Sequence, residues 1–173
     1  FLWQDSGMIQ YRVWHNDIEG KLGLALSHPL FYAVAIGAKY VPIGEFAQRV
    51  NMVSAIAGAA AVANLFLLVR LWLGVNWPAL IAAVTFALSH TFWRHASIAE
   101  TYSLYIALFL FGLIMLLQYF NTGKVGYLYV LGLSNGLALS NHMFASIPFT
   151  CYVVLVAFLL AKKRISLRNL AII

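Results

Sequence analysis

The side chains in this chain that could exchange protons are few and widely spaced. There are five acidic residues and five histidines among 173 residues. They are Asp5, Asp17, Glu19, Glu45, Glu100, His15, His28, His90, His95 and His142. Ionisable groups beside apolar spans are costly unless they have a function or a partner. Alternation of the predicted membrane spans places all of them on one side of a membrane. Such an arrangement suits an active site at the membrane surface.

The composition predicts an integral membrane protein. The chain is 63% hydrophobic and 9% charged, whereas soluble domains carry about 25% charged residues. Its only cysteine is Cys151, so an intrachain disulfide and a thiolate metal cluster are excluded. The basic residues behind the net charge of +6 are scattered, so nucleic acid is not an expected partner.

We interpret both ends of the sequence as parts of apolar segments that would continue in a longer protein. It opens on Phe1-Leu2-Trp3, with neither a methionine nor the basic leader of a signal peptide. It closes on the apolar residues 170–173. We therefore interpret 1–173 as an internal fragment of one transmembrane domain, with 1–4 as the end of an earlier span.

Long uncharged stretches predict an all-α, multi-pass helical bundle. A helix needs about 20 apolar residues to cross the bilayer. The uncharged stretch 125–161 would be about 55 Å long as a single helix, so we expect a break at His142. The five expected spans cover about 50–69, 76–93, 101–121, 127–141 and 145–161.

The basic cluster Lys162-Lys163-Arg164 sets the predicted orientation. It directly follows the last span, which is typical of a cytoplasmic end. Alternation of the spans then puts Arg70 and Lys124 on the same side. The acids and histidines fall on the extracytoplasmic side.

This orientation requires that the apolar segment 29–41 does not cross the membrane. The segment is short, and we expect a helix on the outer surface, with Ser27 as its N-cap and Pro29 in its first turn. Residues 5–49 then form one long extracytoplasmic loop. Loops of this length are usually functional.

Small residues recur at four-residue spacing in two of the expected spans. The stripes are Ala55, Ala59 and Ala63, and Gly132, Gly136 and Ser140. Such stripes let helices approach closely in lipid. We expect them to be packing contacts.

Two residues of the long loop could act in catalysis or could serve the fold alone. Asp5, in Asp5-Ser6-Gly7, could be a general base for an acceptor or could form a turn or helix cap. His28 precedes Pro29 and could bind a phosphate at a helix N-terminus or act as a cap.

Two further groups lie at the same predicted face. Arg94 and His95 could neutralise a phosphate leaving group, and Glu100 could contact a sugar, bind a metal or orient a basic group. An ion pair between Arg94 and Glu100 is the structural alternative. His142 could belong to the same site or end a helix. The sequence has no zinc-ligand spacing, Walker loop or GxGxxG motif.

Taken in order, these motifs resemble the N-terminal part of the GT-C superfamily of membrane glycosyltransferases, and most closely its protein O-mannosyltransferase-like members. The segments that carry the resemblance are Asp5-Ser6-Gly7, 24–32 with His28-Pro29, 47–55 with Arg49-Val50-Asn51, 99–105 with Glu100-Thr101-Tyr102, and 139–142 with Asn141-His142. They span nearly the whole chain. Met8 stands where that family has Glu, and Leu30 and Phe31 stand where it has Pro and Gly.

The resemblance implies a bundle of GT-C type and an inverting transferase. Such an enzyme would move a sugar from a polyprenyl-phosphate-linked donor to a protein, glycan or lipid acceptor. Its active face would be extracytoplasmic or lumenal, in a bacterial inner membrane or the endoplasmic reticulum. Asp5 would be the base and Glu100 a second catalytic residue. The donor-binding positions would be His28, Arg94, His95, Arg49, Tyr102 and His142. No cofactor is implied with certainty, and a divalent metal stays open.

Two other classes of protein remain as alternatives. A transporter or channel would use the acids and histidines as a proton or cation relay. Such a relay would continue through the bilayer, yet the only strongly polar residues in the middle of the spans are Asn64, Gln118 and Asn135. A non-catalytic scaffold subunit would tolerate changes at Asp5 and His28.

Overall fold

The computed structural model describes residues 5–21, 23–24 and 27–170, and the regular secondary structure in this part of the chain is helical, without strands. Its helices are α1 (Ser6–Trp14), α2 (Pro29–Ala38), α3 (Phe46–Leu73), α4 (Asn76–Leu88), α5 (His90–Ser97), α6 (Tyr102–Thr122), α7 (Gly126–Asn141), η2 (Met143–Ala145), α8 (Ser146–Ala161) and α9 (Leu167–Leu170). The all-α prediction is confirmed. The expected span end at 1–4, and Ala25 and Leu26 of the second motif, lie outside the described residues.

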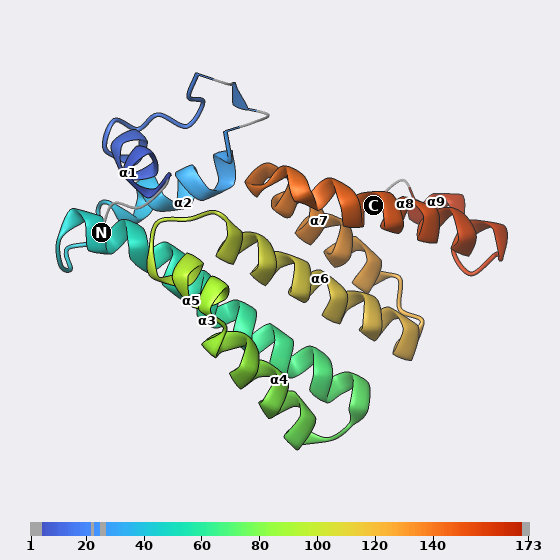
Figure 1. Cartoon of the computed structure of the whole chain (residues 1–173). Helices are drawn as coiled ribbons and strands as arrows, with labels where there is room; N and C mark the ends of the chain where they lie inside the picture. Colours follow the sequence, from blue (N-terminus) through green and yellow to red (C-terminus); the bar gives the residue numbers. More distant parts are fainter. Residues whose placement is uncertain (1–4, 22, 25–26, 171–173) are drawn as a thin grey trace.

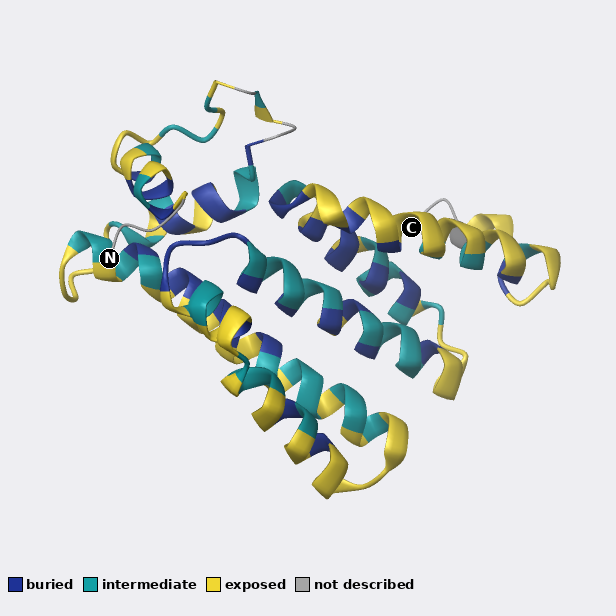
Figure 2. Ribbon diagram, in the orientation of Figure 1, coloured by how far each residue is buried: buried dark blue, intermediate teal, exposed yellow. Residues whose placement is uncertain are grey.

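Helices α3, α6 and α7 lie side by side in that order (Figure 1). Helices α4 and α5 run along α3, and α8 lies beyond α7. Helices α1 and α2 pack where α3 begins and α7 ends. Buried residues line the facing sides of the helices, whereas large apolar side chains such as Ile56, Ile81 and Val154 are exposed (Figure 2). An outer surface of this kind suits lipid.

Three helical segments are long and apolar enough to cross a membrane: Phe46–Leu73, Tyr102–Thr122 and Met143–Ala161. Helix α4 has 13 residues, about 20 Å, which is shorter than the hydrocarbon core of about 30 Å. Helix α7 has 16 residues, about 24 Å. The expected total of five spans therefore stays a prediction.

Local signals explain the ends of several helices. The capping box of α3 pairs the Glu45 side chain with the backbone of Gln48, and Gln48 Oε1 accepts from the Glu45 N–H at 3.0 Å. The helix ends at Gly74, whose φ of 72° favours glycine. The predicted break at His142 is confirmed, since α7 ends at Asn141 and η2 leads into α8.

Helix α2 begins at Pro29, as expected, but its cap is different from the prediction. His28 occupies the N-cap position in a left-handed conformation, with φ 59°. The prediction of Ser27 as N-cap is wrong, because its Oγ donates to the carbonyl of Ile18 at 2.5 Å. The ten residues of α2 extend about 15 Å, too short to cross a bilayer alone.

The helix expected over 76–93 is broken. Helix α4 ends at Leu88, Ser89 is extended with ψ 131°, and α5 starts at His90. The rings of Phe86 and Phe92 lie 4.0 Å apart across the break. Both pack in one apolar cluster with Ala61 of α3. No proline or glycine lies at this break, so we attribute it to the packing of Phe86 and Phe92 against α3.

The predicted small-residue stripe on α3 is wrong in register. Ala55, Ala59 and Ala63 are all exposed. The buried side of the helix instead carries Ser54, Ala57, Gly58 and Ala61. Gly58 faces α5, where a Cβ on this glycine would lie 2.8 Å from the Cβ of Ala96. The close helix approach is therefore between α3 and α5.

Gly58→Ala is expected to destabilise the fold by about 1–3 kcal/mol, because an added methyl group overpacks this contact. Thermal unfolding in detergent measures the effect. Gly37→Ala on α2 is the matched control, since no described atom lies within 4 Å of a Cβ there. That change should leave stability equal or raise it by up to about 1 kcal/mol. Equal unfolding temperatures for the two variants would contradict the close approach.

Candidate active site

The site is organised around the connection between α5 and α6, which is buried although it is a loop. Ile98, Ala99, Glu100 and Thr101 are all buried (Figure 2). Loops normally run over the surface, because a buried backbone must find hydrogen-bond partners. Partners for this loop come from neighbouring helices, and they decide which side chains meet.

Two polar side chains hold this loop. Ser54 Oγ of α3 accepts from the Glu100 N–H and donates to the Glu100 carbonyl, both at 3.0 Å. Asn141 Nδ2, at the end of α7, donates to the Thr101 carbonyl at 2.9 Å. The start of α3, the start of α6 and the end of α7 are therefore tied together at one end of the bundle.

His28 joins the same end of the bundle from the start of α2. Its Nδ1 lies 2.6 Å from the carbonyl oxygen of Asn141. A carbonyl can only accept, so His28 Nδ1 carries the proton. The His28 ring stacks on that of His142, with centroids 5.0 Å apart and an interplanar angle of 23°.

His142 has the opposite tautomer. Its Nδ1 accepts from the Phe144 N–H at 3.1 Å, which leaves the proton on Nε2 of the neutral ring. Burial, and then the charge of His28, lower the pKa of His142. The ring is therefore held neutral, with an Nε2–H available as a donor.

Tyr102 extends this row of rings toward α5. Its ring lies 4.9 Å from His142 and 4.8 Å from His95. Burial, and then the charge of Arg94, lower the pKa of His95. Beside the row is a cavity of about 290 Å³, lined by His28, Pro29, Tyr102, Leu139, Asn141, His142, Met143 and Phe144. Four predicted donor-binding residues thus lie in one row.

The two predicted catalytic carboxylates differ in environment. Glu100 is 5% exposed, whereas Asp5 is exposed. Burial raises the pKa of Glu100, and the negative charge of Asp5 raises it further, against smaller opposing effects of the Thr101 backbone and Arg94. Asp5 stands at the N-cap of α1, yet its side chain makes no capping hydrogen bond. The capping interpretation of Asp5 therefore has no hydrogen bond to support it.

The chain matches, over residues 23–166, the family model described as the protein O-mannosyl-transferase TMEM260 N-terminal domain. The chain belongs to this family. The match covers every candidate site residue except Asp5. No curated protein and no solved structure gives a significant match. The predicted resemblance is confirmed at the level of the family, which is one of glycosyltransferases.

The third motif that the chain shares with the family, 47–55, contains two residues whose positioning role the sequence analysis did not predict. Asn51 and Ser54 are three residues apart, on one face of α3. Asn51 Oδ1 accepts from Gln10 Nε2 of α1 at 3.1 Å, while Ser54 holds Glu100. One helix face therefore positions both the helix that follows Asp5 and the loop that carries Glu100. The i, i+3 spacing of two polar residues in an apolar helix was the available signal.

Arg49 stands apart from the other predicted residues. Its Nη1 donates to the carbonyl of Val41 at 2.7 Å, in the turn before α3. The structure gives Arg49 a contact that holds the loop, and no contact with the row of rings. Its donor-binding role stays a prediction.

The described residues contain no group of three or more histidine, cysteine, aspartate or glutamate side chains placed to hold a metal ion. The electrostatic groups at this end are Asp5, Glu100 and Arg94, together with the rings beside them. Such a set can accept a proton and donate hydrogen bonds to an anion, and burial keeps water away from Glu100.

Proposed function

We propose that the chain forms the N-terminal part of an inverting membrane glycosyltransferase of GT-C type. It moves a sugar, mannose by the family's description, from a polyprenyl-phosphate-linked donor to a protein acceptor. The observation that carries the proposal is the row of His28, His142, Tyr102 and His95 beside the buried loop that carries Glu100, at one end of an apolar bundle. A lipid-linked donor requires a polar site at that position.

Asp5 acts as the base. An exposed carboxylate without a capping bond is free to accept the acceptor's hydroxyl proton. The hydroxyl oxygen attacks the anomeric carbon as the bond to phosphate breaks. The polyprenyl phosphate leaves with the electron pair, and attack from the opposite side inverts the anomeric configuration.

The ring row receives the leaving phosphate. His142, with its Nε2–H, and Tyr102, with its hydroxyl, line the cavity beside the row of rings and can donate to a phosphate there. The positive charge of Arg94 acts on His95 and Glu100. Donors held in place before the reaction stabilise charge that develops on the leaving group. The neutral imidazole of His142 suits this role because it donates without requiring a buried cation.

The distribution of basic residues supports an extracytoplasmic or lumenal site. Six of the eleven basic residues occur at helix ends away from His142 and Glu100, where no acidic residue occurs: Arg70, Lys124, 162–164 and Arg168. Bases concentrate on the cytoplasmic side of membrane proteins. A bacterial inner membrane or the endoplasmic reticulum would both fit.

The full-length protein, reconstituted in liposomes, tests the proposal. We expect it to transfer labelled mannose from polyprenyl-phosphate mannose to serine or threonine of an acceptor protein, with inversion seen by NMR of the product. Direct transfer from a nucleotide sugar, or retention of configuration, would contradict the proposal.

His142→Asn is expected to lower kcat by about tenfold to a hundredfold, the cost of one hydrogen bond to a charged group. Asparagine can still accept from the Phe144 N–H, so the helix connection should persist. His142→Ala removes that acceptor as well and should also cost about 0.5–2 kcal/mol of stability. Unchanged kcat in the asparagine variant, measured by the liposome transfer assay, would contradict a role for the Nε2–H.

A further inference from the structure

The short turn between α3 and α4 holds a hollow at the other end of α3 from the candidate active site. Only Gly74 and Val75 separate the two helices. The hollow has a volume of about 540 Å³ and is lined by residues of both helices: Phe66, Arg70, Asn76, Trp77 and Leu80. We refer to it as the α3–α4 hollow.

The lining of the α3–α4 hollow changes from polar to apolar with distance from the turn. Arg70 and Asn76 lie in the helical turns next to the connection, and Arg70 Nε donates to Asn76 Oδ1 at 2.6 Å. Phe66 and Leu80 each lie one helical turn further from the connection, about 6 Å along the helix axis. The matching ligand is therefore an amphiphile, with its polar head at the turn and an apolar chain along the helices.

Two exposed tryptophans indicate that this turn lies at a membrane surface. Trp72 is 73% exposed and Trp77 is 71% exposed. Tryptophan is enriched at the level of the lipid head groups on both faces of a membrane. Trp77 also lines the α3–α4 hollow. The polar end of the hollow therefore lies at the level of the phospholipid head groups.

Arg70 lies far from the acidic residues of the chain. Residues 46–99 contain no acid. Glu45, the N-cap of α3, lies about 37 Å from Arg70 along the helix axis. Glu100 is held by Ser54, which lies about 24 Å from Arg70 along the same axis. The other acids belong to 5–19, and α1 packs where α3 begins. In the described structure, the positive charge at the hollow is therefore not balanced by a nearby carboxylate.

The side chain of Arg70 suits a phosphate group. Arg70 is exposed, and its bond to Asn76 holds the guanidinium at the hollow. That bond uses one of the five N–H donors of a guanidinium, so the other four can donate to a ligand. Guanidinium groups bind phosphate oxygens through two parallel hydrogen bonds. A phosphate is also the anionic group of the phospholipids around a membrane protein.

We propose that the α3–α4 hollow binds an anionic phospholipid, with its phosphate on Arg70 and the beginning of an acyl chain against Phe66 and Leu80. Basic residues near a membrane surface attract anionic lipids. A zwitterionic phospholipid fits less well, because it brings a cation of its own to the unbalanced charge of Arg70. The proposal goes beyond sugar transfer and does not depend on it, since the hollow lies away from the candidate active site.

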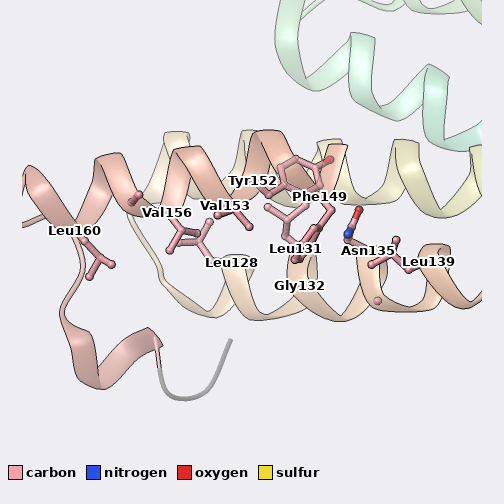
Figure 3. A pocket seen from close by; sticks show the side chains of 12 residues that line it. Leu128, Leu131, Gly132, Asn135, Leu139, Phe149, Tyr152, Val153, Val156 and Leu160 are labelled. Atoms are coloured by element: carbon pink, nitrogen blue, oxygen red, sulfur yellow. The ribbon is translucent and has the colours of Figure 1, made fainter. Parts of the chain in front are cut away.

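A hollow that residues of α7 and α8 line provides a comparison. Its volume is about 360 Å³, and Figure 3 shows Leu131 and Val153 in its lining. Gly136 of the second predicted small-residue stripe also lines it, and no described atom lies within 4 Å of a Cβ built on this glycine. The predicted packing contact is therefore absent at Gly136. None of the described residues that line this hollow is charged, so its lining does not favour an anionic lipid over a neutral one.

Hydrogen–deuterium exchange locates the lipid without a change of sequence. The full-length protein is placed in nanodiscs of phosphatidylcholine, with or without added phosphatidylglycerol. We expect phosphatidylglycerol to slow exchange in 72–79 and to leave exchange unchanged in 122–126, the turn that carries Lys124. Unchanged exchange in 72–79 would overturn the proposal. Equal slowing of both turns would also overturn it, because the lipid would then be attracted by basic turns in general.

The affinity for phosphatidylglycerol, measured by native mass spectrometry of the full-length protein in detergent, tests the role of Arg70. Arg70→Gln should weaken binding about tenfold to a hundredfold, because it removes hydrogen bonds to a charged group. Lys124→Gln is the matched control and should leave the affinity unchanged. Lys124 is also an exposed cation at the same end of the bundle, but it lies outside the hollow.

Asn76→Ala is a second variant, which keeps every charge and removes the bond that holds the Arg70 guanidinium. It should also weaken binding, though less than Arg70→Gln. Equal affinities of Arg70→Gln and Lys124→Gln, or full competition by phosphatidylcholine, would overturn the proposal. Thermal unfolding without added lipid should be the same for all variants, since Arg70, Asn76 and Lys124 are exposed. If Arg70→Gln fails to fold, the exchange measurement on the unmodified protein decides the outcome.

Discussion

Asp5→Asn in the full-length protein is expected to lower sugar transfer by about 10²–10⁴-fold, the usual contribution of a positioned general base. An amide has nearly the same shape as the carboxylate but cannot accept the acceptor's proton. The Asp5 side chain is exposed and makes no capping bond to α1. Expression, membrane insertion and thermal stability should therefore be unchanged.

Glu19→Gln is the matched control for this variant. Glu19 is also an exposed carboxylate of the same loop, and its conversion to an amide should leave transfer intact. Initial rates with the lipid-linked donor at saturating acceptor measure both variants. Full activity of Asp5→Asn would remove Asp5 from the mechanism and leave Glu100 as the carboxylate to test.

Glu100→Gln is expected to lower transfer at least about a hundredfold and, at the same time, to raise thermal stability at neutral pH. Burial and then the charge of Asp5 raise the pKa of Glu100 above its ordinary value of 4.5. A raised carboxyl pKa means that the folded state favours the protonated form. Its contribution to folding is complete below pH 4.5 and is lost as pH rises through the raised pKa. Glutamine is neutral throughout, so the variant avoids that loss.

Unfolding temperatures from pH 4 to pH 8 measure this effect. The gain of Glu100→Gln over the unmodified protein should vanish at the acid end and grow toward neutral pH. Stability gained together with activity lost is typical of a side chain kept for function. A variant that is less stable at neutral pH would show that an ion pair with Arg94 outweighs burial. That result would favour the structural interpretation of Glu100.

The loop between α5 and α6 shows why the site could be predicted only in part. Residue types and motif order pointed to His28, His95, Tyr102 and His142, which the structure brings into one row. The same reasoning includes Arg49, whose guanidinium donates to the carbonyl of Val41 and whose donor-binding role stays a prediction. Side-chain type states what a group can do, whereas its neighbours depend on how the helices pack.

Ser54 and Asn141 hold the loop between α5 and α6, and the sequence analysis did not predict that role for either residue. Their bonds join positions 46 and 40 residues apart, and His28 meets the Asn141 carbonyl across 113 residues. Patterns within a short stretch of sequence do not predict contacts between residues so far apart in the chain. The opposite tautomers of His28 and His142 also follow from these partners, so they were open until the partners were known.

The sequence by itself determined the helical class, the break at His142 and the start of α2 at Pro29. Apolar run length, capping residues and proline act within a few residues, so they can be read locally. Tertiary structure alone decided the break at Ser89, the close contact at Gly58 in place of Ala55, Ala59 and Ala63, and the open hollow that residues of α7 and α8 line. Helices in lipid present apolar side chains on all faces, because lipid and protein interiors are similarly apolar. Periodicity therefore does not mark the inner face, and side-chain packing has to select it.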